Sequence, residues 1–149
     1  MPTIEDIKKL RDETGVSPVQ IKKALEESGG DVQKAKELMN VWGLAKAGKK
    51  AGNETTQGVI DFYVHPSAKT GVLLDIRCET DFVAKSPDFK NLAHEICLQI
   101  AALNPENVEA LLGQPWMKSD AKTIKNLVEE TISKVGENIE VKRFTRYEI

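Results

Sequence analysis

Hydrophobic residues in the first 44 positions recur every three or four residues, which is typical of amphipathic helices. Thr3, Ser17 and Asp31 are each placed to cap such a helix, and Pro18 suits the first position of the second one. We therefore predict a three-helix bundle over residues 1–44. A bundle this small buries few large side chains, which favours a binding module. The positions expected to face its interior are Ile4, Ile7, Leu10, Val19, Ile21, Ala24, Leu25, Val32, Ala35, Leu38, Met39 and Trp42.

Residues 45–58 carry almost no bulky apolar side chain, whereas glycine, lysine and threonine are frequent. This composition predicts a linker that is helical at its start. Lys46, Lys49 and Lys50 are more simply explained as a solvated charged segment than as an RNA contact.

Strict alternation of apolar and polar residues begins at residue 59 and predicts β-strands. Two strands joined by the turn-rich stretch 66–71 form a hairpin with one apolar face. The residues assigned to that face are Ile60, Phe62, Val64, Val72, Leu74, Ile76 and Cys78. Residues 139–147 are also β-rich, but Ile139 and Val141 are in one phase and Phe144 is in the other, which predicts a bulge or an edge strand.

Helical spacing returns between the second and third strands. Ser86 and Pro87 open a long helix, and a short helical piece at 108–112 and an irregular stretch around Pro115 and Trp116 precede another helix, which Gly136 ends. The expected buried stripes are Phe89, Leu92, Ile96, Ile100 and Leu103 in the first, and Ile124, Leu127, Val128, Thr131 and Val135 in the second. The predicted fold class is α+β: a bundle (1–44), a linker (45–58), and a three-stranded antiparallel sheet covered by helices (59–149).

The charge and hydropathy of the chain exclude several classes of protein. A formal net charge of −2 argues against a protein that mainly grips nucleic-acid phosphates, so no direct nucleic-acid binding is expected. No apolar run approaches the roughly 18 residues that span a bilayer, and the first residues lack the pattern of a secretory signal. We therefore expect a cytoplasmic protein with no membrane segment.

Cys78 and Cys97 are the only cysteines, and both fall in apolar periodic segments, where a small buried hydrophobe is the simpler interpretation. A zinc site formed by these two with His65 and His94 has suitable ligand types but lacks a short ligand spacing. A glycine-rich phosphate loop and a Gly-x-Ser-x-Gly motif are also missing. We expect no metal, no cofactor and no enzymatic activity.

The segment 79–85 connects the second strand to the long helix, and binding residues are often found in such loops. Asp81 is followed directly by Phe82, and an acid next to an aromatic ring suits an anchor that enters a partner's pocket. Alternatively, Phe82 or Val83 packs under the helix as core. The hydrophobic pattern alone does not decide between the two.

The run Thr80-Asp81-Phe82-Val83-Ala84-Lys85 resembles the signature of the elongation factor Ts family, and residues 78–79 match its extended form. Residues 134–139, followed by Arg143 and Phe144, resemble a second signature of that family. Further similarities to its N-terminal module are found at Arg11, Thr14, Gly15 and in the segments 22–26, 29–31 and 43–45.

The chain also departs from the family pattern in two respects. Ser17, Pro18 and Val19 stand where the family often has a glycine and a pair of methionines. Long members carry a second core subdomain, a coiled coil and a C-terminal module, so the resemblance is to the short type.

The resemblance implies a guanine-nucleotide exchange factor for the translational GTPase elongation factor Tu (EF-Tu). In this family an acid–aromatic pair intrudes near the Mg²⁺ site of EF-Tu·GDP. Asp81 and Phe82 would do so here, with Thr80 and Val83 shaping the loop. The nucleotide-free GTPase is then the preferred partner.

The resemblance also implies a role for the N-terminal bundle. It is similar to a ubiquitin-associated (UBA) module and is expected to dock on the GTPase through Arg11, Val19, Lys22 and Lys23. Since the single sheet is expected to be uncovered on one side or at one edge, we further expect a homodimer through residues 59–149 and a 2:2 complex with EF-Tu.

Two other interpretations remain open at this point. A UBA-type adaptor at the ribosome or on nascent chains would bind through residues 1–44 alone, whereas an exchange factor would depend on Phe82. A small thiol or metal enzyme would use Cys78, Cys97 and the two histidines.

Overall fold

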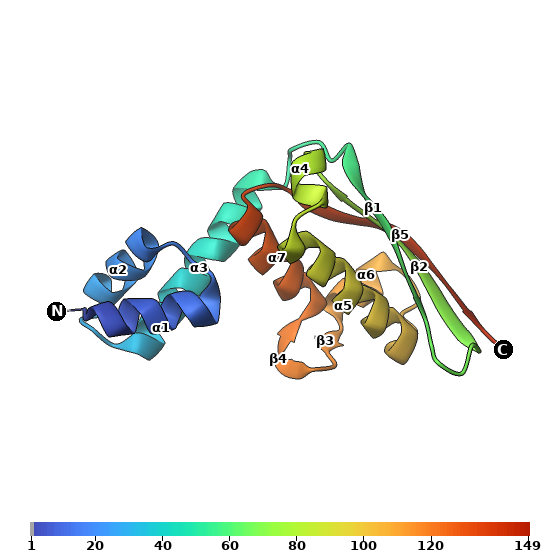
Figure 1. Ribbon diagram of the computed structural model, residues 1–149, viewed down its shortest axis with the longest axis horizontal. Helices are drawn as coiled ribbons and strands as arrows, with labels where there is room; N and C mark the ends of the chain where they lie inside the picture. Colours follow the sequence, from blue (N-terminus) through green and yellow to red (C-terminus); the bar gives the residue numbers. More distant parts are fainter. Residues whose placement is uncertain (1) are drawn as a thin grey trace.

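A helical bundle and an α+β core lie end to end along the molecule, with the two chain termini at opposite ends of its long axis (Figure 1). The computed structural model describes residues 2–149, apart from the side chains of Leu44 and Lys46. The expected α+β class is confirmed. The bundle consists of α1 (Ile4–Thr14), α2 (Pro18–Glu27) and α3 (Val32–Lys50).

Local capping explains where these helices begin and end. Thr3 forms a capping box with Asp6, while Ser17 and Asp31 accept hydrogen bonds from the first backbone N–H groups of α2 and α3. The three predicted caps are therefore confirmed. The interior of the bundle is formed by Leu10, Ile21, Ala24, Leu25, Ala35 and Met39.

Two of the positions expected to face the bundle interior do not. Ile4 is 85% exposed and Val19 is 79% exposed. Val19 lies in the first turn of α2, on the side opposite Ile21 and Leu25, and three short helices leave nothing to cover that side.

Helix α3 continues through residue 44 without a break as far as Lys50, so the first part of the expected linker is helical. Ala47 is buried in the core that α5, α7 and the sheet share. Gly43 lies so close to α7 that a Cβ placed there would be 3.3 Å from Ser133 Oγ. The C-terminal half of α3 therefore packs on the core. The side chain of Lys46 lies outside the described residues.

Three antiparallel strands form the main sheet in the order β1 (Gln57–Val64), β2 (Thr70–Cys78) and β5 (Ile139–Glu148). The pairing register of β2 with β5 shifts between Asp75 and Ile76. As a result Phe144 packs against the core although it is out of phase with Val141, so the predicted bulge is confirmed.

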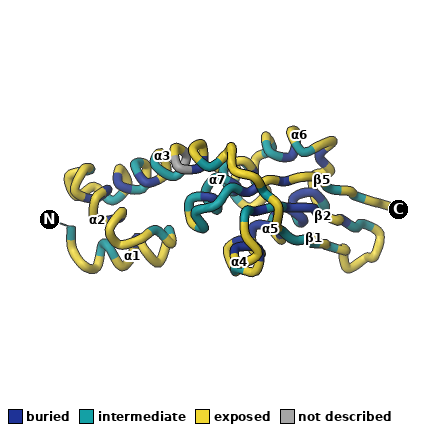
Figure 2. Tube along the Cα trace, turned by 90° about the horizontal axis from the view of Figure 1, so that it is seen from above, coloured by how far each residue is buried: buried dark blue, intermediate teal, exposed yellow. Residues whose placement is uncertain are grey.

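Helices cover one face of this sheet, and the buried segments concentrate where α5 meets β2 (Figures 1 and 2). These helices are α4 (Asp81–Ala84), α5 (Pro87–Leu103), α6 (Val108–Gly113) and α7 (Ile124–Val135). Ser86 caps α5 and Gly136 ends α7 with φ 74°, as predicted. Leu103, assigned to the buried stripe, is instead 47% exposed, because it lies in the last turn of α5.

A small hairpin between α6 and α7 was missed by the sequence pattern, which indicated an irregular stretch. It consists of β3 (Pro115–Trp116) and β4 (Ser119–Thr123). The buried side chain of Gln99 holds it, donating to the Pro115 carbonyl at 3.0 Å and accepting from the Met117 N–H at 3.0 Å. Such a contact is not visible in local periodicity.

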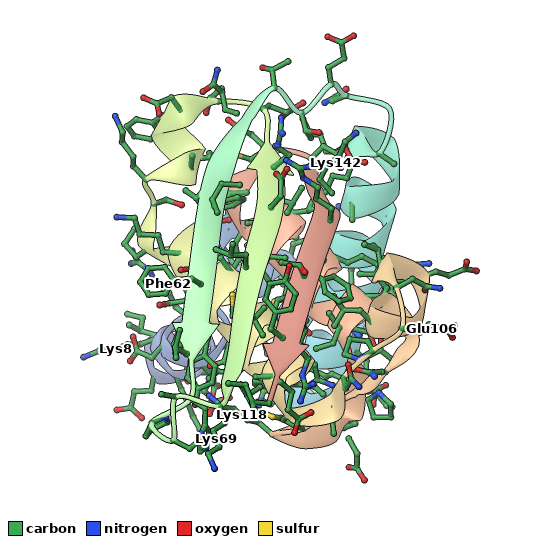
Figure 3. All side chains as sticks on the ribbon, turned by 90° about the vertical axis from the view of Figure 1, so that its right-hand side faces the viewer. Lys8, Phe62, Lys69, Glu106, Lys118 and Lys142 are labelled. Atoms are coloured by element: carbon green, nitrogen blue, oxygen red, sulfur yellow. The ribbon has the colours of Figure 1, made fainter. Side chains whose placement is uncertain are left out.

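The other face of the sheet is uncovered, and we call it the open face (Figure 3). It presents Ile60, Phe62 and Val64, which are 61%, 66% and 57% exposed. The assignment of these three residues to the same apolar face as Leu74 was wrong. The observed register pairs Phe62 with Leu73, so Val59 and Tyr63 face the core instead. Within residues 2–149, no helix combines the length and hydrophobicity needed to cross a membrane.

Candidate functional site

The loop that links β2 to α5 contains the one-turn helix α4, which was not expected from the sequence. We call residues 80–83 the tip segment. Thr80 caps this turn by accepting a hydrogen bond from the Val83 N–H at 3.2 Å. The sequence left open whether Phe82 and Val83 are exposed for binding or packed in the core. Phe82 is 87% exposed, whereas Val83 is 6% exposed and belongs to the core.

Asp81, the residue before Phe82, is also mostly exposed. Lys85, one turn further on, forms an ion pair with it at 2.9 Å. Both side chains are mostly exposed, so water and salt screen this pair and it holds the carboxylate only weakly. The Asp81 carboxylate can therefore leave Lys85 and bind a group on a partner instead.

Thr80 is held from a distant part of the chain. The carboxylate of Glu137 accepts hydrogen bonds from the Thr80 N–H at 2.9 Å and from its hydroxyl at 2.7 Å. Glu137 follows Gly136, which ends α7. The resemblance to a second signature covered this residue, but no sequence pattern indicated that it would meet the tip segment 57 positions earlier.

Comparisons with known proteins show similarity over the part of the chain that contains this site. The family model described as "Elongation factor TS" matches residues 79–149, which include the whole tip segment and Glu137. Elongation factor Ts of Coprothermobacter proteolyticus is 41% identical over 186 residues, covering 95% of this chain and 94% of that protein. The chain belongs to the elongation factor Ts family. This membership places it among the elongation factors.

Other relatives differ from the chain in extent. Elongation factor Ts of Carboxydothermus hydrogenoformans is 37% identical, and the match covers 100% of this chain and 89% of that protein. The protein of the same name from Aquifex aeolicus is 43% identical over 98% of the chain, but only 52% of that relative is matched. Elongation factor Ts relatives therefore include longer proteins.

The docking residues that the family resemblance implied lie on α1 and α2, at the opposite end of α3 from α4 (Figure 1). Val19, Lys22 and Lys23 share the exposed side of α2, and Arg11 is exposed on α1. Lys23 Nζ lies 5.2 Å from the centroid of the Trp42 ring, so this exposed lysine also approaches α3. The bundle surface and the tip segment of this elongation factor Ts family member are thus separate.

The zinc or thiol site considered from the sequence is not formed. Both cysteines are buried in the core, where desolvation raises the pKa of Cys78 to about 11 and that of Cys97 to about 12. The Nδ1 atom of His65 is hydrogen-bonded within its own turn, to Ser67, and His94 is exposed on α5. Across the described residues, no three His, Cys, Asp or Glu side chains are placed to hold a metal ion.

Proposed function

We propose that this chain is a guanine-nucleotide exchange factor, which binds EF-Tu·GDP and promotes release of GDP so that GTP can bind. The observation that carries the proposal is the Phe82 ring, 87% exposed on a turn whose next two residues, Val83 and Ala84, are buried. An exposed aromatic ring on a rigid mount loses little conformational entropy on binding, which suits an interface hot spot.

The proposed mechanism is a displacement. Asp81 and Phe82 would enter the partner beside its Mg²⁺ site. Displacing the ion would weaken the binding of GDP, because the ion helps to hold the phosphates of the nucleotide. By reciprocal linkage, bound nucleotide lowers the affinity of the GTPase for the factor by the same ratio. The factor must therefore bind the nucleotide-free GTPase more tightly than the GDP form. No covalent bond changes in this chain, so it acts as a binding partner in the cytoplasm and not as an enzyme, and it needs no cofactor.

The bundle supplies a second contact in this proposal. Arg11, Val19, Lys22 and Lys23 dock on the GTPase, with Val19 as the apolar centre at 79% exposure. The ion pairs of Lys22 with Glu26 and of Lys23 with Glu27 are long, at 3.9 Å, and exposed, so both lysines can turn toward a partner at small cost.

The open face supports a further part of the proposal, that two copies of the chain associate and form a 2:2 complex with EF-Tu. Ile60, Phe62, Val64, Leu73 and Tyr147 on this face are all more than half exposed. A group of large apolar side chains exposed together on one face of a sheet is typical of an interface. Two identical faces would cover each other about a twofold axis.

A nucleotide-release assay tests the function directly. EF-Tu is loaded with fluorescent GDP, excess unlabelled GDP is added, and the fluorescence decay is followed with and without this chain. We expect the chain to accelerate release even when it is present below the concentration of EF-Tu. An unchanged rate of GDP release at a saturating concentration of the chain would refute the proposal. A UBA-type adaptor, the less favoured alternative, would bind its target through the bundle and leave this rate unchanged.

A further inference from the structure

The tip segment cannot hold the Phe82 ring in one direction by itself. Helix α4 contains four residues, and a single helical turn is unstable by itself because nucleation fixes several dihedral angles for one hydrogen bond. Phe82 lies in the middle of this turn and contributes no burial of its own. Other groups must therefore fix its direction.

Three of these groups lie within the same segment of the chain. Val83 and Ala84 are inserted in the core, and the Ser86 hydroxyl donates to the Val83 carbonyl at 2.7 Å. These contacts fix the C-terminal side of the turn. Its N-terminal side depends on Thr80, which is itself exposed and makes its side-chain contacts to polar groups.

Glu137 determines how the Thr80 hydroxyl is oriented. A hydroxyl has one proton, and an ionised carboxylate accepts hydrogen bonds but donates none. Thr80 therefore directs its proton to Glu137 at 2.7 Å and keeps a lone pair for the Val83 N–H at 3.2 Å. The second carboxylate oxygen accepts from the Thr80 N–H at 2.9 Å. A continuous chain of hydrogen bonds thus runs from Glu137 through Thr80 to Val83.

We infer that Glu137 is the positioning residue of the tip segment, and that its two hydrogen bonds to Thr80 hold the Phe82 ring in the orientation needed to enter the partner. This inference rests on the proposed function. Glu137 itself touches no reacting group and acts through Thr80. It lies at the end of α7, so the tip is attached both to its own strand and to the helix that packs against α3.

The test compares Glu137→Gln with Glu140→Gln. Both changes convert a carboxylate to an amide, but Glu140 accepts from Thr55 in the linker and makes no hydrogen bond to Thr80. Two quantities are measured for each full-length variant: the hydrogen-exchange rate of the Val83 amide, and the rate of GDP release from EF-Tu as a function of variant concentration. The melting temperature checks that the fold is intact.

For Glu137→Gln we expect the Val83 amide to exchange roughly tenfold faster and the maximal release rate to fall roughly tenfold, since a hydrogen bond to a charged group is removed. The concentration for half-maximal release should stay within about twofold, because the bundle contacts are untouched. Glu140→Gln should leave both quantities at the wild-type values. A general loss of stability would instead change all the slowly exchanging core amides together.

Thr80 variants provide an independent measurement if Glu137→Gln folds poorly. Thr80→Val removes the hydroxyl and should show the Glu137→Gln defect, whereas Thr80→Ser keeps the hydroxyl and should keep the slow exchange of the Val83 amide. Combining Thr80→Val with Glu137→Gln should add little further loss, because both remove the same interaction.

The outcomes separate this inference from the proposed function. Unchanged Val83 exchange in Glu137→Gln overturns the inference. Faster exchange with an unchanged release rate, when wild type is active, also overturns it. If wild type itself fails to release GDP while Glu137→Gln still accelerates Val83 exchange, the proposed function is wrong and Glu137 is nevertheless shown to position the tip.

Discussion

Asp75 of β2 and Arg143 of β5 face each other across paired strands, and Arg143 Nε donates to the Asp75 carboxylate at 3.1 Å. Arg77 donates to the same carboxylate at 2.6 Å through Nε. Asp75 is only 4% exposed although it points to the open face. The two guanidinium groups cover it, and the charged cluster lies directly beside the apolar residues of that face.

The Asp75 cluster predicts a specific dependence of stability on pH. Hydrogen bonding to Arg77, and then to Arg143, lowers the pKa of the Asp75 carboxyl below its ordinary value of 3.8. Its contribution to the free energy of unfolding is therefore present above about pH 4 and lost as pH falls through the lower folded-state pKa. Urea unfolding between pH 7 and pH 2 should show a steeper acid loss for wild type than for Asp75→Asn. Parallel curves would contradict this assignment.

Two phenylalanines near the tip should separate function from stability. Phe82→Ala should reduce the maximal GDP-release rate by more than about tenfold, because truncating a hot-spot aromatic costs about 2 kcal/mol or more. Its melting temperature should match wild type, since the ring is exposed. Phe89→Ala, at a fully buried position in α5, should lower the free energy of unfolding by about 3–5 kcal/mol. Calorimetry and the release assay on both variants distinguish these expectations.

Asp81→Asn should have a smaller effect on GDP release than Phe82→Ala. The amide keeps the shape of the side chain but loses the charge that would act near Mg²⁺. Lys85→Gln is the matched control, because it removes the ion-pair partner of Asp81 and leaves the carboxylate intact. An exposed pair contributes about 0–1 kcal/mol, so Lys85→Gln should change the release rate only slightly. Equal defects in the two variants would show that the pair, and not the acid alone, matters.

Self-association should depend on the open face. Phe62→Lys places a charge within the apolar group formed by Ile60, Val64 and Leu73. We expect sedimentation equilibrium to give a dimer for wild type and a monomer for Phe62→Lys at micromolar concentration. Leu103→Lys, which changes a half-exposed residue at the end of α5, should remain dimeric. A monomeric wild-type chain would exclude the homodimer and the 2:2 complex.

Glycine is required at one position of β1. Gly58 has φ 154°, and a Cβ at this position would overlap the Ile76 carbonyl oxygen of the neighbouring strand. Gly58→Ala should therefore destabilise the protein by more than about 1 kcal/mol. Gly48→Ala in α3 is the control, because nothing lies within 4 Å of the new Cβ, and it should stabilise by about 0.5–1 kcal/mol. Urea midpoints of the two variants should move in opposite directions.

The helix ends were predictable because they depend on neighbours in the sequence. Thr3, Ser17 and Ser86 each satisfy backbone N–H groups within the next three residues, so a short window contains the whole interaction. The bulge in β5 was predictable for a similar reason, since the change of phase between Val141 and Phe144 lies within four residues.

The faces of β1 were not predictable in this way. Both of its faces carry apolar side chains, Val59 and Tyr63 on one and Phe62 with its neighbours on the other. Alternation fixes which residues lie together but not which set is buried. Pairing with β2 decides that, because β2 has only one face that packs on α5.

Local sequence was enough to predict the helix caps, the α+β class and, through the Thr80–Lys85 run, the family and the segment of interest. The folded arrangement was needed to show that Phe82 points outward while Val83 is buried, and that Glu137 holds Thr80 from 57 residues away. These two kinds of feature differ in the range of the interactions that fix them. Capping and periodicity act within one or two turns, whereas the direction of a side chain in a loop depends on which distant surfaces the folded chain brings against it.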